Sequence, residues 1–279
     1  MYFKEIKIMD SKIFLWNDKK SAGTGHIEDD FQPYIELSLL ETAEPTGVVI
    51  VLPGGGYRAR AAHEGAPIAA KFNALGFHAV ILQYRVAPYR YPAPQQDVMR
   101  AIAMVRANAQ KWNIDPQHIA VCGFSAGGHL TCCSGTIALN VDRSAGDFID
   151  EVSARPNAMI LCYPVISADK TITHMGSVRE LSGQEEPSAD FSALTSLENQ
   201  ICEDTPPAFL WHTATDGAVN VQNSLRFAQN MWAKGKTAEL HVYPEGCHGL
   251  GLAVDTVDVR TWPELAANFL MKNGFPCQK

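Results

Sequence analysis

The most informative stretch of this chain is Ile119-Ala-Val-Cys-Gly-Phe-Ser-Ala-Gly-Gly-His-Leu130. Its first half, 119–124, is an apolar run typical of a strand that is buried on both faces. The pattern G-x-S-x-G follows at 123–127, and a helical run extends from there through Leu139. This pattern between a strand and a helix places the serine on a sharp turn that exposes its hydroxyl. We therefore predict that Ser125 is a nucleophile.

Other apolar runs of strand length surround this stretch. Between them lie helical patterns, such as the apolar residues spaced three and four apart after Pro94. The alternation of strands and helices predicts an α/β fold with a mostly parallel central sheet flanked by helices. The further expected strands are 48–52, 79–84, 158–163, 208–211 and 239–243.

The two ends of the chain have different patterns. Residues 1 to about 45 contain shorter alternating runs, which fit antiparallel strands at one edge of the sheet. These runs are 3–8, 12–16 and 34–39. Near the other end, Thr261 and Glu264 have capping-box spacing, and Gly274 follows the last apolar residues. This pattern predicts a closing helix, with Pro263 in its first turn.

Length and composition indicate one folded domain over residues 1–279. The chain is 46% apolar and 19% charged, as in an ordinary globular protein of this size. Its net charge of -7 and the lack of a basic run argue against a nucleic-acid partner. No stretch reaches the roughly 18 apolar residues of a spanning helix, so we also expect no membrane partner.

The cysteines and the first residues favour a cytoplasmic location. The seven cysteines include no CxxC pair, so we expect reduced thiols and no metal site. The first twenty residues mix charged and apolar side chains, which is unlike a signal peptide. We expect no cofactor, and the sequence leaves a homo-oligomer open.

Residues 167–207 interrupt the strand and helix rhythm. The segment has no long periodic pattern and is rich in Ser, Thr, Glu and Asp. It follows an expected strand on the side where ligands bind in open α/β sheets. We therefore predict a short insertion over the active site.

A glycine-rich turn follows the expected strand 48–52. The sequence Pro-Gly-Gly-Gly-Tyr at 53–57 lacks the dinucleotide pattern G-x-G-x-x-G. Acyl transfer requires N–H donors that converge on the carbonyl oxygen of the substrate. The N–H groups of Gly55, Gly56 and Ala126 are our candidates for this oxyanion hole.

The general base should be a histidine that follows the acid in sequence. Of the nine histidines, His241 and His212 lie within expected strands, and His129 lies one helical turn beyond Ser125. His248 instead lies in a turn-rich loop after the last expected strand, where its side chain can reach over the sheet edge. We therefore predict His248 as the base.

The acidic residue of the triad should lie just after the end of the strand that precedes the histidine. Asp216 follows the expected strand 208–211 and precedes a glycine, so it is our candidate to orient the histidine. Glu245 is a weaker candidate because it lies only three residues from His248. Asp255 and Asp258 lie in a later loop and rank below both.

Several motifs together resemble a known family. They are PGGGY at 53–57, HEG at 63–65, QYRVAP at 83–88, YPAPQQD at 91–97, GFSAGG at 123–128, PPAFLWHTATD at 206–216 and YPEGCHGLGL at 243–252. The chain resembles the bacterial acetyl-xylan and acetyl-sugar esterases of the α/β-hydrolase fold, which are related to the hormone-sensitive-lipase-like esterases. Tyr57 and His63, which belong to these motifs, are candidates for the substrate pocket.

The resemblance implies a small-molecule substrate with short acyl esters, particularly acetyl groups on xylose-type sugars. A glycosidase would need two facing carboxylates, whereas the sequence supplies Ser, His and Asp. A small serine peptidase or a thioesterase on the same fold stays open. A catalytically silent binding protein is the non-enzyme alternative, and the complete set of three residues argues against it.

Overall fold

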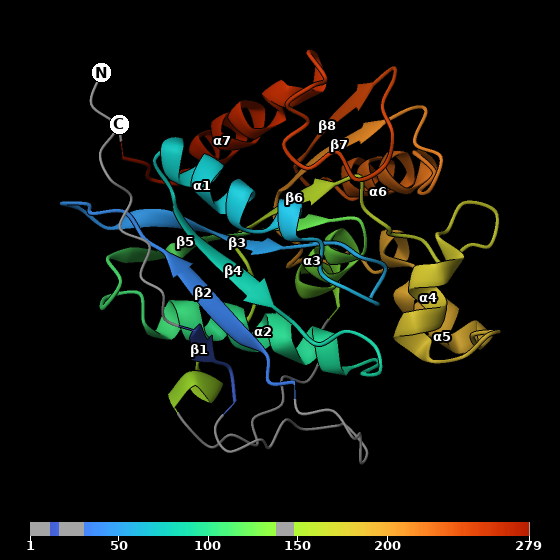
Figure 1. Cartoon of the computed structure of the whole chain (residues 1–279), viewed down its shortest axis with the longest axis horizontal. Helices are drawn as coiled ribbons and strands as arrows, with labels where there is room; N and C mark the ends of the chain where they lie inside the picture. Colours follow the sequence, from blue (N-terminus) through green and yellow to red (C-terminus); the bar gives the residue numbers. More distant parts are fainter. Residues whose placement is uncertain (1–11, 17–30, 138–147, 279) are drawn as a thin grey trace.

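A mostly parallel sheet forms the centre of the molecule (Figure 1). The structure, a computed structural model, describes residues 12–16, 31–137 and 148–278. Within these ranges eight strands pair in the order β1-β2-β4-β3-β5-β6-β7-β8. The strands are β1 (Lys12–Phe14), β2 (Tyr34–Ser38), β3 (Thr46–Leu52), β4 (His78–Gln83), β5 (Ile114–Phe124), β6 (Ala158–Cys162), β7 (Ala208–Thr213) and β8 (Ala238–Tyr243).

The strand directions confirm a mixed sheet. Strand β1 pairs antiparallel with β2, and β2 pairs antiparallel with β4. The remaining neighbours are parallel. The short N-terminal strands thus form one edge, as their alternating patterns predicted. The run expected at 3–8 lies outside the described residues.

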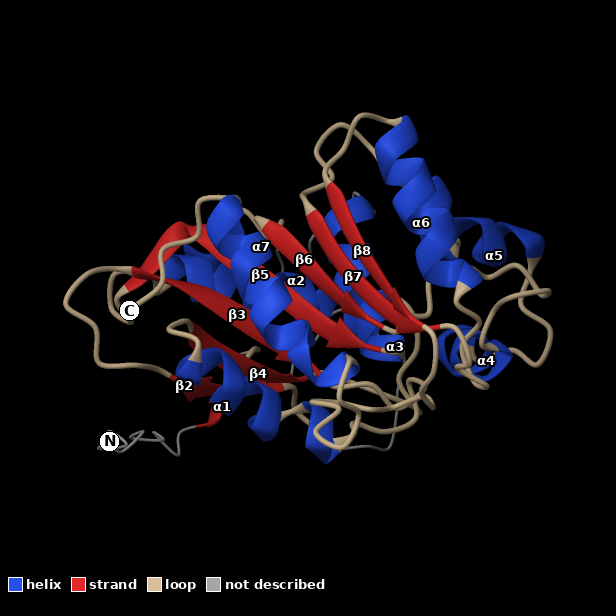
Figure 2. Ribbon diagram, turned by 90° about the horizontal axis from the view of Figure 1, so that it is seen from above, coloured by secondary structure: helices blue, strands red, loops and turns tan. Residues whose placement is uncertain are grey.

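Helices cover both faces of the sheet (Figure 1 and Figure 2). Helices α1 (Ala66–Ala74) and α7 (Trp262–Lys272) lie on one face. Helices α2 (Ala93–Ala107), α3 (Ala126–Thr136) and α6 (Gln222–Ala233) lie on the other. Helix α3 ends before Leu139, which lies outside the described residues.

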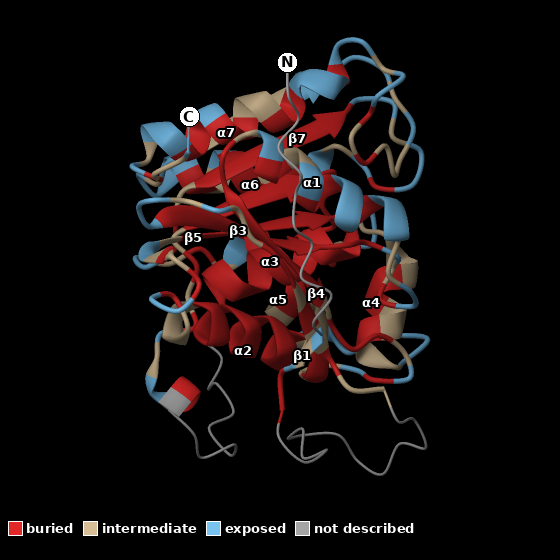
Figure 3. Cartoon of the chain, turned by 60° about the vertical axis from the view of Figure 1, so that its left-hand side comes forward, coloured by how far each residue is buried: buried red, intermediate tan, exposed pale blue. Residues whose placement is uncertain are grey.

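Strand β3 illustrates why the central strands read as unbroken apolar runs. All seven of its residues are buried. Val49 and Val51 belong to the same core cluster as Phe72 of α1. Ile50, which points the opposite way, belongs to the core cluster that contains Ile102 of α2. Burying one such side chain stabilises the fold by about 1.5–3 kcal/mol, so both faces need apolar residues. Figure 3 shows the central strands mostly in the colour of buried residues.

The start of α7 differs from the capping box expected from the sequence. Thr261 has helical angles, φ -85° and ψ -5°, because it ends a 3-10 turn, η4 (Val259–Thr261). Its hydroxyl donates to the Asp258 carbonyl at 2.9 Å and does not cap α7. The capping-box prediction was wrong, since that motif requires an extended cap residue. The position of the helix was predicted correctly.

The insertion at 167–207 contains regular structure that its composition did not indicate. It forms helices α4 (Met175–Ser182) and α5 (Ala189–Thr195) and the 3-10 turn η3 (Leu197–Asn199). Helices α4 and α5 lie beyond the end of the sheet in Figure 1 and Figure 2. Each helix is only about two turns long, too short for a sequence periodicity to stand out.

In the described ranges, no helix has the length and apolar character needed to cross a membrane.

Two further 3-10 turns complete the regular elements, η1 (Ala62–Glu64) after the glycine-rich turn and η2 (Phe148–Glu151) before β6.

Candidate active site

Ser125 lies on the sharp turn between β5 and α3. Its backbone angles, φ 53° and ψ -117°, are unusual for a residue with a side chain. A Cβ atom at Gly123 would lie 2.1 Å from the Gly127 carbonyl oxygen, and one at Gly127 would lie 2.3 Å from the Leu52 carbonyl oxygen. Both positions of the pattern therefore require glycine, because the turn packs against its own helix and against β3.

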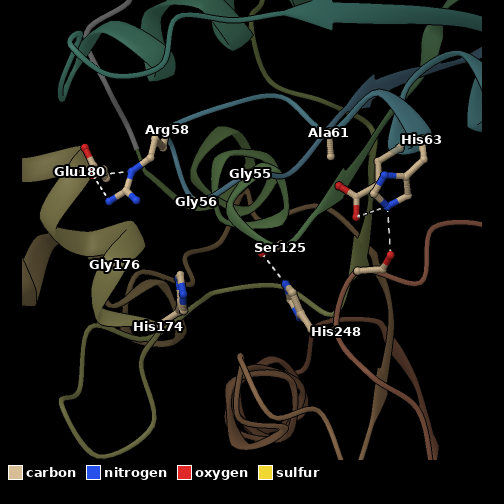
Figure 4. Close-up of a pocket in the computed structure, with 12 residues that line it drawn as sticks. Gly55, Gly56, Arg58, Ala61, His63, Ser125, His174, Gly176, Glu180 and His248 are labelled. Carbon is tan, nitrogen blue, oxygen red and sulfur yellow. Dashed lines mark hydrogen bonds and ion pairs between the residues drawn. The ribbon is translucent and has the colours of Figure 1, made fainter.

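The structure brings Ser125, His248 and Asp216 together. The Nε2 atom of His248 lies 2.8 Å from the Ser125 hydroxyl (Figure 4). The Nδ1 atom lies 2.7 Å from Asp216 Oδ2. Because a carboxylate only accepts, Nδ1 carries the proton and Nε2 is free to accept the serine proton. The sequence placed these three residues in three separate loops and predicted them as nucleophile, base and acid.

Hydrogen bonds stabilise the ionised form of Asp216. Burial of its side chain raises the pKa, but hydrogen bonds from His212 and His248 and from two backbone N–H groups outweigh burial and hold the pKa well below its usual value. The two N–H groups, of Ala218 and Val219, each donate to Oδ1 at 2.9 Å. The carboxylate therefore faces His248 as an anion.

The glycine-rich turn lies beside Ser125. Among the described residues, Gly54 donates its N–H to Glu64 Oε2 at 2.8 Å, whereas the N–H groups of Gly55 and Gly56 have no acceptor within the protein. The N–H of Ala126 opens α3 and so lacks an acceptor inside the helix. The three N–H groups expected to form an oxyanion hole are thus available to a ligand.

Glu64 is a buried carboxylate that the sequence analysis did not assign. Only 3% of its side chain is exposed. Besides Gly54, it accepts a hydrogen bond from the Tyr163 hydroxyl at 2.6 Å. The Tyr163 oxygen accepts in turn from the Gly251 N–H at 2.9 Å, and its ring packs edge-on against His248 at 5.0 Å. Glu64 therefore joins the glycine turn to the loop that carries the histidine.

A second connection between these loops comes from His63. Its Nε2–H donates to the Gly249 carbonyl at 2.9 Å, next to His248 in sequence. More than half of the His63 side chain is exposed, and it lines the pocket above Ser125. On the other side of the same loop, the N–H of Gly246 donates to the Thr215 hydroxyl at 2.9 Å.

A cavity of about 420 Å³ opens over Ser125 (Figure 4). Most of its side chains are polar, and Ala61 supplies its single aliphatic side chain. The insertion contributes one wall through α4 and the residue before it. The polar residues of the lining besides Ser125 and His248 are Arg58, His63, Glu64, His174 and Glu180.

Tyr57, expected in the pocket, lies elsewhere. Its side chain is only 1% exposed and is absent from the cavity lining. Its hydroxyl contacts His129 Nδ1 at 2.8 Å, below the turn. The turn reverses the chain at Tyr57, where φ is 61°, and this directs the ring into the core between β4 and α3. Tyr57 therefore supports the glycine turn from inside.

The rejected histidines are engaged in structural contacts. His129 is buried, its Nε2 lies 3.1 Å from the Thr195 carbonyl, and burial lowers its pKa to about 4. His212 contacts Ser224 and the Val219 carbonyl, and its Nε2 lies 3.4 Å from Asp216. Neither ring forms a hydrogen bond with the Ser125 hydroxyl, and His129 contacts Ser125 only through its backbone N–H, which donates to the Ser125 carbonyl at 3.1 Å. In the part of the chain that the structure describes, no group of three His, Cys, Asp or Glu residues could hold a metal ion.

Five residues at or beside the site were not predicted from the sequence, namely Glu64, Tyr163, His174, Arg58 and Glu180. Glu64 belongs to the HEG motif at 63–65, but the motif does not show which way its side chain points. Tyr163 is a tyrosine at the end of an expected strand, where a positive φ of 37° turns it toward His248. His174 and Glu180 belong to the insertion and have no signal beyond that location.

The fold, the serine turn and the hydrogen-bonded Ser, His and Asp define the chain as an α/β hydrolase. A family model matches residues 38–231. The chain belongs to this family, BD-FAE.

Two curated relatives carry xylan-related names. Endo-1,4-beta-xylanase B of Butyrivibrio fibrisolvens is 37% identical over 213 residues, which cover 74% of this chain and 33% of the relative. Acetylxylan esterase of Xylanibacter ruminicola is 31% identical over 236 residues, which cover 82% of this chain and 46% of the relative. The chain thus spans between a third and about half of the length of these relatives.

Two solved structures are similar to this chain over almost its whole length. The acetyl ester-xyloside bifunctional hydrolase from Caldicellulosiruptor lactoaceticus is 41% identical with a TM-score of 0.90, covering 95% of this chain and 97% of that one. Carboxylesterase Cest-2923 from Lactobacillus plantarum is 28% identical with a TM-score of 0.74, covering 89% and 95%. These relatives confirm the predicted fold and place the chain among enzymes of the esterase class.

Proposed function

We propose that the chain is a serine carboxylesterase that hydrolyses short acyl esters, chiefly acetyl esters of sugars or xylo-oligosaccharides. The observation that carries this proposal is the continuous set of contacts from Asp216 through His248 to Ser125. The set lies beside N–H groups that have no acceptor in the protein. Together they supply a nucleophile, a base and an oxyanion site.

The acylation half of the reaction begins with the serine proton. His248 Nε2 takes this proton as Ser125 Oγ attacks the ester carbonyl, and Asp216 stabilises the imidazolium. The N–H groups of Gly55, Gly56 and Ala126 hold the negative oxygen of the tetrahedral intermediate. The intermediate collapses as His248 returns the proton to the alcohol oxygen, which leaves an acyl group on Ser125.

Water completes the cycle. His248 takes a proton from a water molecule, whose oxygen attacks the acyl carbon. The second tetrahedral intermediate releases the carboxylic acid, and the proton returns to Ser125 Oγ. Each half thus uses the same base and the same oxyanion donors.

The small volume of the cavity favours a short acyl group, and the charged and imidazole side chains among its lining residues offer hydrogen bonds to a polar alcohol. Acetyl groups need only a small apolar space. The names of the relatives, acetylxylan esterase and acetyl ester-xyloside bifunctional hydrolase, point to the same kind of substrate.

Glycoside cleavage has less support at this site. It needs one carboxyl group as acid and another as base or nucleophile. Of the two glutamates in the lining, Glu64 accepts hydrogen bonds from Gly54 and Tyr163, and Glu180 pairs with Arg58. Both are engaged with protein groups, whereas the Ser125 hydroxyl faces its base.

A substrate panel with a Ser125→Ala variant tests the proposal. We expect the wild type to hydrolyse p-nitrophenyl acetate faster than the butyrate and octanoate esters, and to release acetate from acetylated xylo-oligosaccharides. Ser125→Ala should lower kcat by about 10⁶. A fluorophosphonate probe should label the wild type at Ser125 alone. Activity retained in Ser125→Ala, or preference for aminoacyl-anilides or acyl thioesters, would contradict the proposal.

A further inference from the structure

His174 lies in the cavity wall that the insertion contributes. It immediately precedes α4, and its side chain is half-buried. In Figure 4 the ring stands beside the Ser125 and His248 pair and faces the glycine turn. A Cβ atom built on Gly56 would lie 4.0 Å from its Cε1 atom. The ring therefore borders the space that an ester would occupy.

The start of α4 fixes which nitrogen of His174 carries the proton. The backbone N–H of Ser177 donates to Nδ1 at 3.3 Å, as in a helix cap. A backbone N–H can only donate, so Nδ1 must be an acceptor and the proton of the neutral ring is on Nε2. The Ser177 hydroxyl also contacts Nδ1, at 2.8 Å. Nε2–H is therefore a fixed donor.

The electrostatic surroundings keep this ring neutral. Burial lowers the pKa of His174, and the Arg58 guanidinium and His248, when His248 is protonated, act in the same direction, whereas Asp216 opposes them. No protein acceptor contacts Nε2 among the hydrogen bonds of the described residues. Gly176 leaves room for the ring, since a Cβ there would lie 3.2 Å from Cε1.

The chemistry of an acetyl ester indicates which part of the substrate the Nε2–H of His174 can bind. An acetyl group has a methyl and one carbonyl oxygen, and the oxyanion donors of the glycine turn and α3 are placed for that oxygen. A further donor in the cavity is therefore available to the alcohol part of the substrate. The Arg58 and Glu180 pair, whose Nε and Oε1 atoms are 2.8 Å apart, lines the same cavity as His174.

We propose that His174 is a specificity-determining residue whose Nε2–H donates to a hydroxyl or ring oxygen of a carbohydrate alcohol. Arg58 and Glu180 line the same side of this subsite. The inference rests on the proposed esterase function and adds how the enzyme distinguishes a sugar from an apolar alcohol. A site built to bond a hydroxyl discriminates against an analogue that lacks it, because its polar group is then left unpaired.

The test compares substrates that share the acetyl group. An acetylated methyl xyloside carries hydroxyls, cyclohexyl acetate has a ring of similar size without them, and p-nitrophenyl acetate reports the esterase chemistry. His174→Asn keeps a side chain that can cap α4 but removes the donor from its place. We expect it to raise KM for the xyloside acetate roughly 10-fold, and to affect the other two esters, which offer no hydroxyl to this donor, much less.

Two further variants make the outcome specific. Ser177→Ala removes the hydroxyl from Nδ1 but keeps the backbone donor, so we expect a smaller rise in KM for the xyloside acetate alone. His241→Asn is the matched control, because His241 is partly buried, bonds Glu239 on β8 and lies outside the cavity lining. It should leave all three substrates unchanged.

Each outcome separates the two proposals. Equal losses of His174→Asn on all three esters, or no change on the xyloside acetate, would overturn the role of His174 while the esterase function stands. If Ser125→Ala hydrolyses p-nitrophenyl acetate as fast as the wild type, the proposed function itself fails. Turnover of p-nitrophenyl acetate retained by His174→Asn also shows that the variant is folded.

Discussion

The carboxylate of Glu64 accepts the Tyr163 hydroxyl at 2.6 Å, and this contact ties together the two loops that flank Ser125. The other oxygen of Glu64 holds the Gly54 N–H, and Tyr163 holds the Gly251 N–H. The proposed oxyanion donors and the proposed base therefore have a common buried support. In a triad enzyme, the oxyanion donors and the base must keep their relative position as negative charge develops on the substrate oxygen.

Replacing Glu64 by Gln should impair this support without removing a reacting group. An amide presents only one acceptor oxygen, so either the Gly54 N–H or the Tyr163 hydroxyl loses its partner. We expect kcat for p-nitrophenyl acetate to fall by up to about 100-fold, with KM nearly unchanged. Glu186→Gln is the control, since Glu186 is an exposed partner of Lys170. Equal kinetics of the two variants would show that Glu64 has no positioning role.

Asp216→Asn tests the choice of acid. The amide oxygen can still accept from Ala218 and Val219, so the loop should fold, but the neutral side chain no longer stabilises the imidazolium of His248. We expect kcat to fall by about 10⁴. Asp258→Asn, at a lower-ranked carboxylate, should leave kcat unchanged. A larger loss in Asp258→Asn than in Asp216→Asn would reverse the assignment.

Gly55→Ala should damage the glycine turn by steric overlap. Gly55 has φ +130°, and a Cβ there would lie 2.3 Å from the Ala59 carbonyl oxygen. The turn must then move, and we expect esterase activity to fall at least about 100-fold. Gly235 is the control, because its φ of +68° is also positive but an added Cβ atom there would meet no atom within 4 Å. Gly235→Ala should cost about 1 kcal/mol of stability and no activity, so the comparison separates overlap from backbone strain.

His129 should make stability depend on pH. Burial lowers its pKa to about 4, whereas the unfolded chain has the ordinary value of 6.5. Between these values the unfolded state binds a proton that the folded state excludes, so stability falls as pH falls. The decrease from pH 7 to pH 4 should be about 3 kcal/mol from this residue. Urea unfolding of wild type and His129→Gln over this range measures it, and a stability difference independent of pH would contradict it.

Much of the fold could be predicted from local pattern. The central strands are apolar on both sides because helices cover both faces, and the serine turn requires glycine at 123 and 127 because backbone atoms pack there. The order of Ser125, Asp216 and His248 along the chain also follows from the fold. The cytoplasmic location, the absence of a nucleic-acid partner and the oligomeric state stay predictions.

Side-chain direction was harder to predict than position. Tyr57 and Glu64 both lie in motifs that were recognised, yet Tyr57 points into the core and Glu64 points under the glycine turn. Their directions depend on the packing of β4, α3 and Tyr163, which come from distant parts of the chain. The short helices of the insertion were missed for a related reason, since tertiary contacts stabilise them more than their own periodicity does.

The strand, turn and helix around Ser125 are encoded locally, because apolar pattern and glycine act on neighbouring residues. The contact between Ser125 and His248 joins residues 123 positions apart, and the link from Glu64 to Tyr163 spans 99. Such contacts form when parallel strands align their carboxyl ends and bring their loops to one edge of the sheet. The amino-acid pattern thus identifies the candidate reacting residues, and the packed sheet sets the distances between them.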